Sequence, residues 1–76
     1  MIRKYKVISV RSKTDKVNSA HEYILDKVVT LDKAKIHLGE PLYLGPLRTS
    51  RVLSCQNEDF NIKIETEHTY YYLQLM

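Results

Sequence analysis

The sequence contains few of the residues that stabilise small folds by special chemistry. Its 76 residues include one cysteine, two glycines, two prolines and no tryptophan. A lone cysteine cannot form an internal disulfide, and no Cys/His set has zinc-finger spacing, so the two staples common in small domains are missing. Cys55, at the end of a hydrophobic stretch, is interpreted as core filler rather than as a nucleophile. Stability must come from packing, and we expect self-association into a homo-oligomer to add to it.

Long apolar runs and catalytic motifs are missing as well. The longest apolar runs are a few residues, too short for a membrane span or a signal peptide. The chain has no phosphate-binding glycine loop and no nucleophile elbow. No i, i+4 spacing suited to a metal ion occurs among His21, His37 and His68. We therefore expect a soluble, cytoplasmic protein that is not an enzyme and that holds neither a cofactor nor a metal.

Length and composition predict one small domain that spans residues 1–76. A chain of 9.0 kDa is about half of a typical domain allotment and buries roughly 60 % of its unfolded surface. Hydrophobic residues make up 43 % and charged residues 28 %, close to globular averages. The chain should fold around one thin core.

The N-terminal part of the chain predicts strands joined by a long loop. Residues 2–10 alternate β-branched or aromatic residues with lysines, which is typical of a half-buried strand. Residues 11–21 are polar and rich in turn formers, and are interpreted as a loop. Residues 23–30 are ambiguous between helix and strand, and we favour a strand. Residues 42–44 form another short strand.

Residues 31–38 are flanked by the capping residues of a short α-helix, and we predict a helix there. Thr30 supplies a hydroxyl N-cap, and Gly39 stands where a helix commonly ends. Leu31, Ala34 and Leu38 fall on one face at helical spacing, so that face is expected to pack on a sheet.

The C-terminal part predicts an antiparallel meander. A strand over 49–55 is followed by a turn at 56–59 and by a strand over 60–66, whose even-numbered residues, Phe60 first, point inward. A tight turn at residues 67–68 leads into a last strand. Several short strands and one short helix predict a mainly β fold, a small β-barrel or curled antiparallel sheet of the SH3-like or OB-like kind. An α+β sheet is the alternative.

A short segment rich in hydrogen-bond donors precedes the meander. Its members are Arg48, Thr49, Ser50 and Arg51. Two guanidinium groups and two hydroxyls within four residues offer many donors to phosphate or carboxylate oxygens. Alternatively, one arginine pairs with Glu65 or Glu67 across the meander while the hydroxyls bond to nearby backbone. Both interpretations stay open.

Tyrosine accounts for six of the seven aromatic residues, and three tyrosines are consecutive at Tyr70, Tyr71 and Tyr72. Because a strand alternates its faces, either Tyr71 or the other two should project away from the core. Exposed tyrosines suit base stacking or a protein interface. The alternative is that they merely cover a thin sheet.

Positive charge is concentrated in the N-terminal half. Residues 1–38 carry nine basic and four acidic residues, whereas residues 39–76 carry three basic and five acidic residues. A basic cluster opposed only by Asp15 comprises Arg3, Lys4, Lys6, Arg11, Lys13 and Lys16. The cluster could attract nucleic acid, or it could be a solvated edge strand that lysines protect from aggregation.

Three segments of the C-terminal half resemble a known pattern. They are Leu-Gly-Glu-Pro-Leu-Tyr-Leu at 38–44, Leu-Arg-Thr-Ser-Arg-Val at 47–52 and Thr-Glu-His-Thr-Tyr-Tyr-Tyr-Leu at 66–73. Together they resemble small accessory proteins of bacteriophages and mobile elements, over about half the chain. The resemblance implies a non-enzymatic, phage-type binding module that binds a host protein or sequesters a nucleotide ligand, and that thereby inhibits host antiviral defence.

Two binding surfaces follow from these observations. In the first, residues 48–51 contact the anionic part of a ligand, and the three consecutive tyrosines supply stacking area. In the alternative, the protein is a small nucleic-acid-binding barrel that uses its basic N-terminal strand. No membrane contact is expected in either case.

Overall fold

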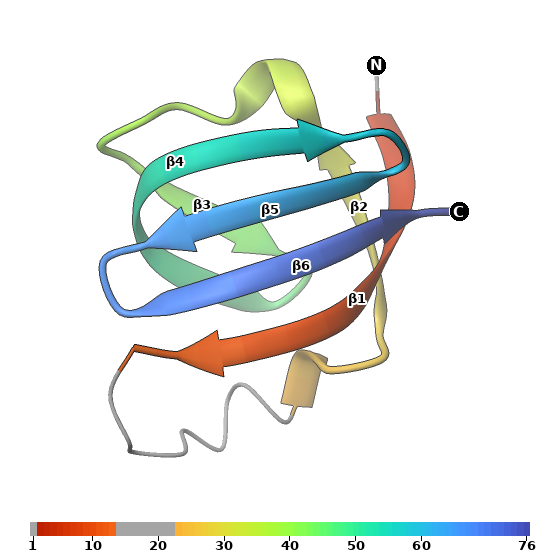
Figure 1. The fold of residues 1–76 in the computed structure, drawn as a ribbon, viewed down its shortest axis with the longest axis horizontal. Coiled ribbons are helices and arrows are strands. Elements are labelled where there is room, and N and C mark those ends of the chain that lie inside the picture. The colour runs from red at the N-terminus through yellow and green to blue at the C-terminus, as the bar shows by residue number, and fades with distance from the viewer. Residues whose placement is uncertain (1, 14–22) are drawn as a thin grey trace.

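The computed structural model describes residues 2–13 and 23–76, and this part of the chain is built almost entirely of antiparallel strands. The order of hydrogen-bonded neighbours is β2-β1-β6-β5-β4-β3 (Figure 1). The strands are β1 (Ile2–Ser12), β2 (Val28–Asp32), β3 (Pro41–Leu44), β4 (Leu47–Glu58), β5 (Asn61–Thr66) and β6 (Thr69–Leu75).

The sheet curls until its two edge strands, β2 and β3, approach each other (Figure 1). Where they meet, a Cβ atom added to Gly45 would lie 3.5 Å from Cγ1 of Val29. Gly45 also has a φ of 61°, which a glycine adopts without strain in the two-residue turn between β3 and β4. The nearly closed barrel-like sheet confirms the predicted mainly β class, and the α+β alternative is wrong.

The core lies inside the curl and follows the expected alternation. Tyr5 and Val7 of β1, and Tyr71 and Leu73 of β6, are buried. Ile62, Ile64 and Thr66 of β5 point inward as predicted. Ile24 is 1 % exposed and adds a large side chain from a helical turn before β2.

A β-bulge in β1 shifts the side-chain alternation of its second half. Val7 faces Leu73, whereas Ser9 faces Tyr72, so Ile8 is an extra residue in the ladder. An added residue shifts the side chains that follow it to the opposite face. As a result Val10 packs against the core, and Arg11, opposite Tyr70, points outward.

The predicted α-helix over residues 31–38 is wrong. Leu31 and Asp32 belong to β2, and only η1 (Lys33–Lys35) is helical, as one 3₁₀ turn. Leu31 is 5 % exposed because it continues the inward alternation begun by Val29. The cap of η1 is Asp32, whose carboxylate accepts a hydrogen bond of 3.0 Å from the Ala34 amide. Burial of Leu31 in a β-strand therefore outweighs the helix-capping signals at Thr30 and Gly39.

The turn predicted at residues 56–59 lies further along the chain. β4 continues to Glu58, and Asp59 and Phe60 form a two-residue loop in which Asp59 has a φ of 52°. Phe60 is therefore 72 % exposed rather than inward, which corrects its predicted place.

The remaining differences concern the boundaries of the predicted elements. The strand favoured for residues 23–30 begins only at Val28. Of the predicted loop at 11–21, residues 11 and 12 extend β1, and residues 14–21 lie outside the described residues. Neither helical turn in the described part of the chain has the length and apolarity that a membrane span requires.

Candidate functional site

The donor segment at residues 48–51 does not converge on one ligand position. Its residues begin β4, where Arg48 and Arg51 are exposed, Ser50 is half-buried and Thr49 is only 5 % exposed. The Thr49 hydroxyl accepts a hydrogen bond of 3.0 Å from the Leu42 amide and donates one of 2.7 Å to the Ser50 carbonyl. Thr49 thus joins β4 to β3 and faces away from any ligand in solvent.

Arg51 is committed to an ion pair within the fold. Its Nε and Nη2 atoms donate to the two carboxylate oxygens of Glu67 at 3.0 and 3.3 Å. The backbone N–H of Arg51 donates to the same carboxylate at 3.3 Å. These hydrogen bonds raise the pKa of Arg51 and lower the pKa of Glu67. The pairing with Glu67 that the sequence left open is therefore present.

The three consecutive tyrosines divide between the two faces of β6. Tyr71 is 3 % exposed, and burial raises the pKa of its phenol. Tyr70 and Tyr72 are half-buried on the outer face. The available aromatic surface is consequently the pair Tyr70 and Tyr72, and Tyr71 belongs to the core.

Basic side chains surround this outer pair. On β5, Lys63 faces Tyr72 and its Nζ lies 5.4 Å from the ring centroid of Tyr70 and 5.6 Å from that of Tyr72. From the end of β1, Lys13 places its Nζ 5.0 Å from the Tyr70 centroid. Such distances fall within the range of cation–π attraction. Arg11 faces Tyr70 from β1.

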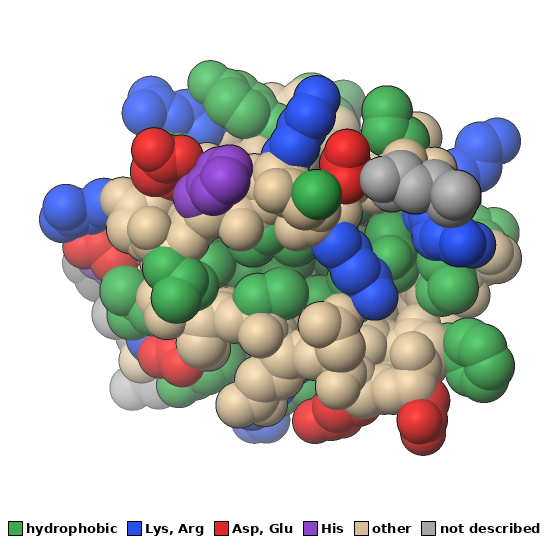
Figure 2. Space-filling view, turned by 90° about the horizontal axis from the view of Figure 1, so that it is seen from above, with side chains coloured by type: hydrophobic (Ala, Val, Ile, Leu, Met, Phe, Trp, Pro, Cys, Tyr) green, Lys and Arg blue, Asp and Glu red, His purple; other side chains and the backbone are tan. Residues whose placement is uncertain are grey.

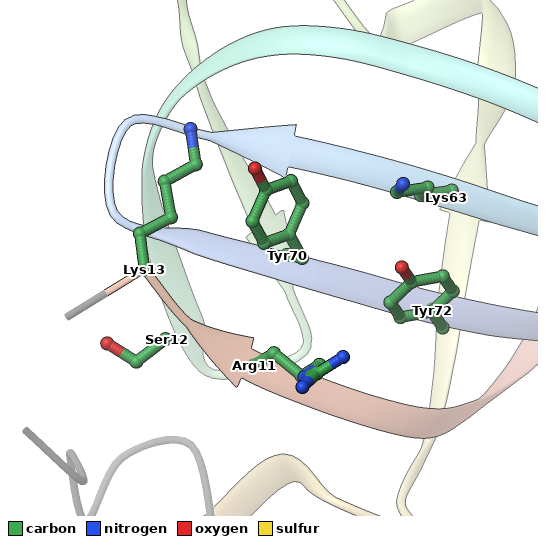
Figure 3. Close-up of a pocket in the computed structure, with 6 residues that line it drawn as sticks. All are labelled: Arg11, Ser12, Lys13, Lys63, Tyr70 and Tyr72. Carbon is green, nitrogen blue, oxygen red and sulfur yellow. The ribbon is translucent and has the colours of Figure 1, made fainter. Parts of the chain in front are cut away.

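These side chains line a shallow hollow of about 490 Å³ (Figure 3). Figure 3 shows the two tyrosines next to each other along β6, with Lys63 beside them on β5 and Arg11 on β1. We call this surface the tyrosine–lysine face and define it as Arg11, Lys13, Lys63, Tyr70 and Tyr72.

One carboxylate, Glu65, adjoins the tyrosine–lysine face. Glu65 lies on β5 opposite Tyr70 of β6. Its carboxylate forms an ion pair of 2.5 Å with Lys13. The hydrogen bond from Lys13 lowers the pKa of Glu65, and Ser54 donates a further hydrogen bond at 3.4 Å. The ion pair neutralises Lys13, whereas Arg11 and Lys63 have no ion-pair partner among the described residues.

The predicted basic cluster is divided by the fold. Lys6 faces Gln74 and shares the outer surface with Tyr72, whereas Lys4 faces Thr30 towards the sheet edge. Arg3, opposite Leu31, lines a separate hollow with Asp59 and Phe60. Arg11 and Lys13 belong to the tyrosine–lysine face, and Lys16 lies outside the described residues.

Lys63 is the residue that sequence reasoning missed. The alternation of β5 places it outward, and the tight turn at residues 67–68 sets the register of β5 against β6. Counting back from that turn pairs Glu65 with Tyr70 and Lys63 with Tyr72. The hairpin register was therefore the signal that could have found it.

A second, apolar hollow lies between η1 and β4. It measures about 390 Å³ and is lined by Ile36, Leu38, Leu53 and Cys55, among others. Figure 2 looks onto this end of the molecule, where apolar side chains line a shallow depression. Burial raises the pKa of the Cys55 thiol. In the described residues no group of three or more His, Cys, Asp or Glu side chains is placed to hold a metal ion.

Comparison with known proteins supplies no relative. No protein-family model matches the chain, and the searches of curated proteins and of solved structures find no significant match. The resemblance to phage accessory proteins therefore stays a prediction.

Proposed function

We propose that the protein is a non-enzymatic binding module that holds a nucleotide-containing ligand on the tyrosine–lysine face. The observation that carries this proposal is the position of Lys63, whose Nζ lies 5.4 and 5.6 Å from the ring centroids of Tyr70 and Tyr72. An aromatic ring accepts a nucleobase by stacking. A lysine beside that ring neutralises the phosphate of the same nucleotide.

The tyrosine–lysine face is favoured over the donor segment at residues 48–51 because its groups are available. Thr49 and Arg51 already bond within the fold. Arg11 and Lys63 point outward beside half-buried rings and have no ion-pair partner among the described residues. A ligand bound beside Tyr72 would displace no ion pair among the described residues, because the one pair on this face joins Lys13 to Glu65 next to Tyr70.

The one thiol of the chain is poorly suited to act as a nucleophile. Cys55 is half-buried, and burial raises its pKa, so the fraction of nucleophilic thiolate at neutral pH is low. A module that binds without reacting acts by sequestration. That role agrees with a phage-type accessory protein that withdraws a nucleotide ligand in the host cytoplasm and so inhibits host defence.

A host protein is the second candidate ligand, and the apolar hollow favours it. Leu38 is 67 % exposed and Leu53 is 48 % exposed at its rim. Exposed leucines around a hollow are typical of a protein interface. The same surface is available for contact between copies of this chain.

Titration of the ¹⁵N-labelled protein tests the leading proposal. The probes are adenosine monophosphate and a mixed-sequence single-stranded hexanucleotide. We expect the amide shifts of Lys63, Tyr70 and Tyr72 to move together. We expect Lys63→Ala to weaken binding, while Lys35→Ala, which removes an exposed lysine of η1, leaves it unchanged.

Salt dependence provides an independent measurement. If three phosphates are neutralised, the affinity for the hexanucleotide should fall roughly 20-fold between 50 and 200 mM salt. Absence of shifts with both probes, or shifts gathered around Arg48, would exclude the tyrosine–lysine face as the binding surface.

A further inference from the structure

We propose that the ligand is single-stranded nucleic acid, and that Tyr70 and Tyr72 each stack one of two neighbouring bases. This inference rests on the proposed function, because it names the ligand class of the same face. It also specifies how the strand of nucleic acid lies on the protein. The bases lie along β6, and the phosphates lie over the flanking strands.

The spacing of the two tyrosines excludes a duplex. Tyr70 and Tyr72 are two residues apart on one face of β6, so their Cα atoms are separated by about 6.7 Å. Successive bases in a duplex strand are about 3.4 Å apart along the axis. Two bases can each cover one ring only if they are splayed to about twice that distance. A single strand allows this, whereas the bases of a duplex are paired and stacked on each other.

The charges beside β6 are placed for the backbone of such a strand. Lys63 flanks the tyrosines on β5 and lies within 5.6 Å of both ring centroids. On the other side, β1 presents Arg11 opposite Tyr70 and Lys6 opposite Gln74. A strand lying along β6 would thus meet positive charge on both sides and at both ends of the tyrosine pair.

Polar side chains continue the same face beyond the tyrosines. Gln74 is outward on β6, and it faces Asn61 on β5. Beside Lys63, β4 presents Gln56. Amide side chains offer both donors and acceptors to base edges. The face therefore combines stacking area, phosphate neutralisation and hydrogen-bonding groups on three adjacent strands.

Lys13 makes the two ring positions unequal. Its ammonium lies 5.0 Å from the Tyr70 centroid and is held by Glu65, so a base stacking on Tyr70 must displace it. At Tyr72 only the Lys63 ammonium lies against the ring among the described residues. Tyr72 is therefore the first stacking position, and Tyr70 is occupied when the strand is longer than one nucleotide.

The test is fluorescence anisotropy with a labelled eight-nucleotide oligothymidine at 50 mM salt. The competitors are thymidine monophosphate, di- and tetrathymidine, and a DNA hairpin duplex with the same number of phosphates as the probe. We expect tetrathymidine to compete at least about tenfold better than the mononucleotide, because the second stacked base alone is worth roughly five- to 150-fold. We expect the duplex to compete less well than the single strand.

Variants assign the effect to the rings. Tyr72→Ala should weaken binding of the eight-nucleotide probe by roughly five- to 150-fold, and Tyr72→Phe, which keeps the ring, should change it less than about twofold. Tyr43→Ala removes a tyrosine that is 64 % exposed on β3 and serves as the matched control. Thermal melting of each variant checks that it is folded.

The outcomes separate this inference from the proposed function. If the mononucleotide competes as well as tetrathymidine, or the duplex competes as well as the single strand, the inference is overturned while nucleotide binding stands. These two comparisons use the unmodified protein, so they decide the matter even if an alanine variant fails to fold. If no probe or competitor binds, both the inference and the proposed function fail.

Discussion

A single buried hydroxyl holds the turn that brings the tyrosine–lysine face together. Thr66 is 0 % exposed, and its Oγ1 donates to the Thr69 carbonyl at 3.0 Å and accepts from the Thr69 amide at 3.1 Å. These bonds close the turn between β5 and β6, immediately before Tyr70. The register that sets Lys63 opposite Tyr72 starts from this turn.

We predict that Thr66→Val lowers the free energy of unfolding by about 1–3 kcal/mol, because the shape is kept while the two buried hydrogen bonds between the Thr66 hydroxyl and the Thr69 backbone are lost. Thr66→Ser keeps the hydroxyl and should cost less than Thr66→Val. Denaturant unfolding followed by circular dichroism measures both variants. Equal losses for valine and serine would show that the methyl group, and not the hydroxyl, stabilises the turn.

Among the described residues Glu65 is the carboxylate beside the stacking rings, and its ion pair holds Lys13 over Tyr70. We predict that Glu65→Gln raises the affinity for single-stranded nucleic acid by up to about fivefold at 50 mM salt, because it removes a negative charge and releases Lys13. The gain should shrink at 500 mM salt, where exposed charges are screened. Anisotropy measures both, and Glu40→Gln, which removes an exposed carboxylate before β3, is the control.

At the scale of elements, the ion pair between Arg51 and Glu67 fastens β4 to the β5–β6 turn. The hydrogen bonds lower the pKa of Glu67, so the folded protein binds a proton at this site less readily than the unfolded chain does. Its stabilising effect is complete above the unfolded carboxyl pKa of about 4.3 and is lost as the pH falls through the lower folded value.

We therefore predict that Glu67→Gln flattens the acid side of the stability profile. The wild-type melting temperature should fall more steeply from pH 5 to pH 3 than that of Glu67→Gln, while the two profiles run parallel between pH 6 and pH 8. Glu40→Gln, which removes an exposed carboxylate before β3, should keep the wild-type slope. A Glu67→Gln profile with the wild-type slope would mean that other carboxylates set the acid limit.

Two elements show what the sequence could and could not predict. In β5 and β6 alternation and a tight turn agree, so both strands and the inward Ile62, Ile64 and Thr66 follow from pattern, whereas the inward face of β6 is decided by its packing. The helix expected at residues 31–38 failed because Leu31 fits both a helical face and a strand face, and only the sheet pairing with Arg3 decides between them.

The outer face of β1 was unpredictable for a different reason. The bulge at Ile8 depends on the pairing of β1 with β6 and on the backbone bonds that Val7 makes with residues 26 and 27, at 2.8 and 2.9 Å. These partners are distant in sequence, so no local pattern reveals the shift. Without the bulge, Arg11 would point into the core instead of joining the tyrosine–lysine face.

At the scale of the whole molecule, the fold places the basic N-terminal strand beside the tyrosine-bearing C-terminal strand. The sequence predicted these as two separate surfaces for two separate functions. The antiparallel pairing of β1 with β6 joins Arg11 and Lys13 to Tyr70 and Tyr72 on one face. In the donor segment at residues 48–51, Thr49 and Arg51 bond to tertiary partners that the sequence does not single out.

The small core and the exposed apolar residues lead us to predict a homodimer. Leu38 and Leu53 are 67 % and 48 % exposed beside the apolar hollow, on the opposite side of β4 from the strands that carry the tyrosine–lysine face. A dimer through this hollow would bury the leucines and leave both stacking faces in solvent. A stable interface needs about 800 Å² per partner, so a dimer contact centred on the hollow would extend over the surface around it.

Sedimentation velocity at 5–100 µM should give a mass of about twice 9.0 kDa. Leu53→Asp should shift the equilibrium towards monomer, because Leu53 is the extra residue of a bulge in β4 and points away from the core. Leu25→Asp changes another exposed leucine, in the turn before β2, and should leave the dimer intact. A monomer at 100 µM would contradict the dimer. A dimer that persists in Leu53→Asp would place the interface on another surface. If dimerisation abolishes nucleic-acid binding, the interface lies on the tyrosine–lysine face.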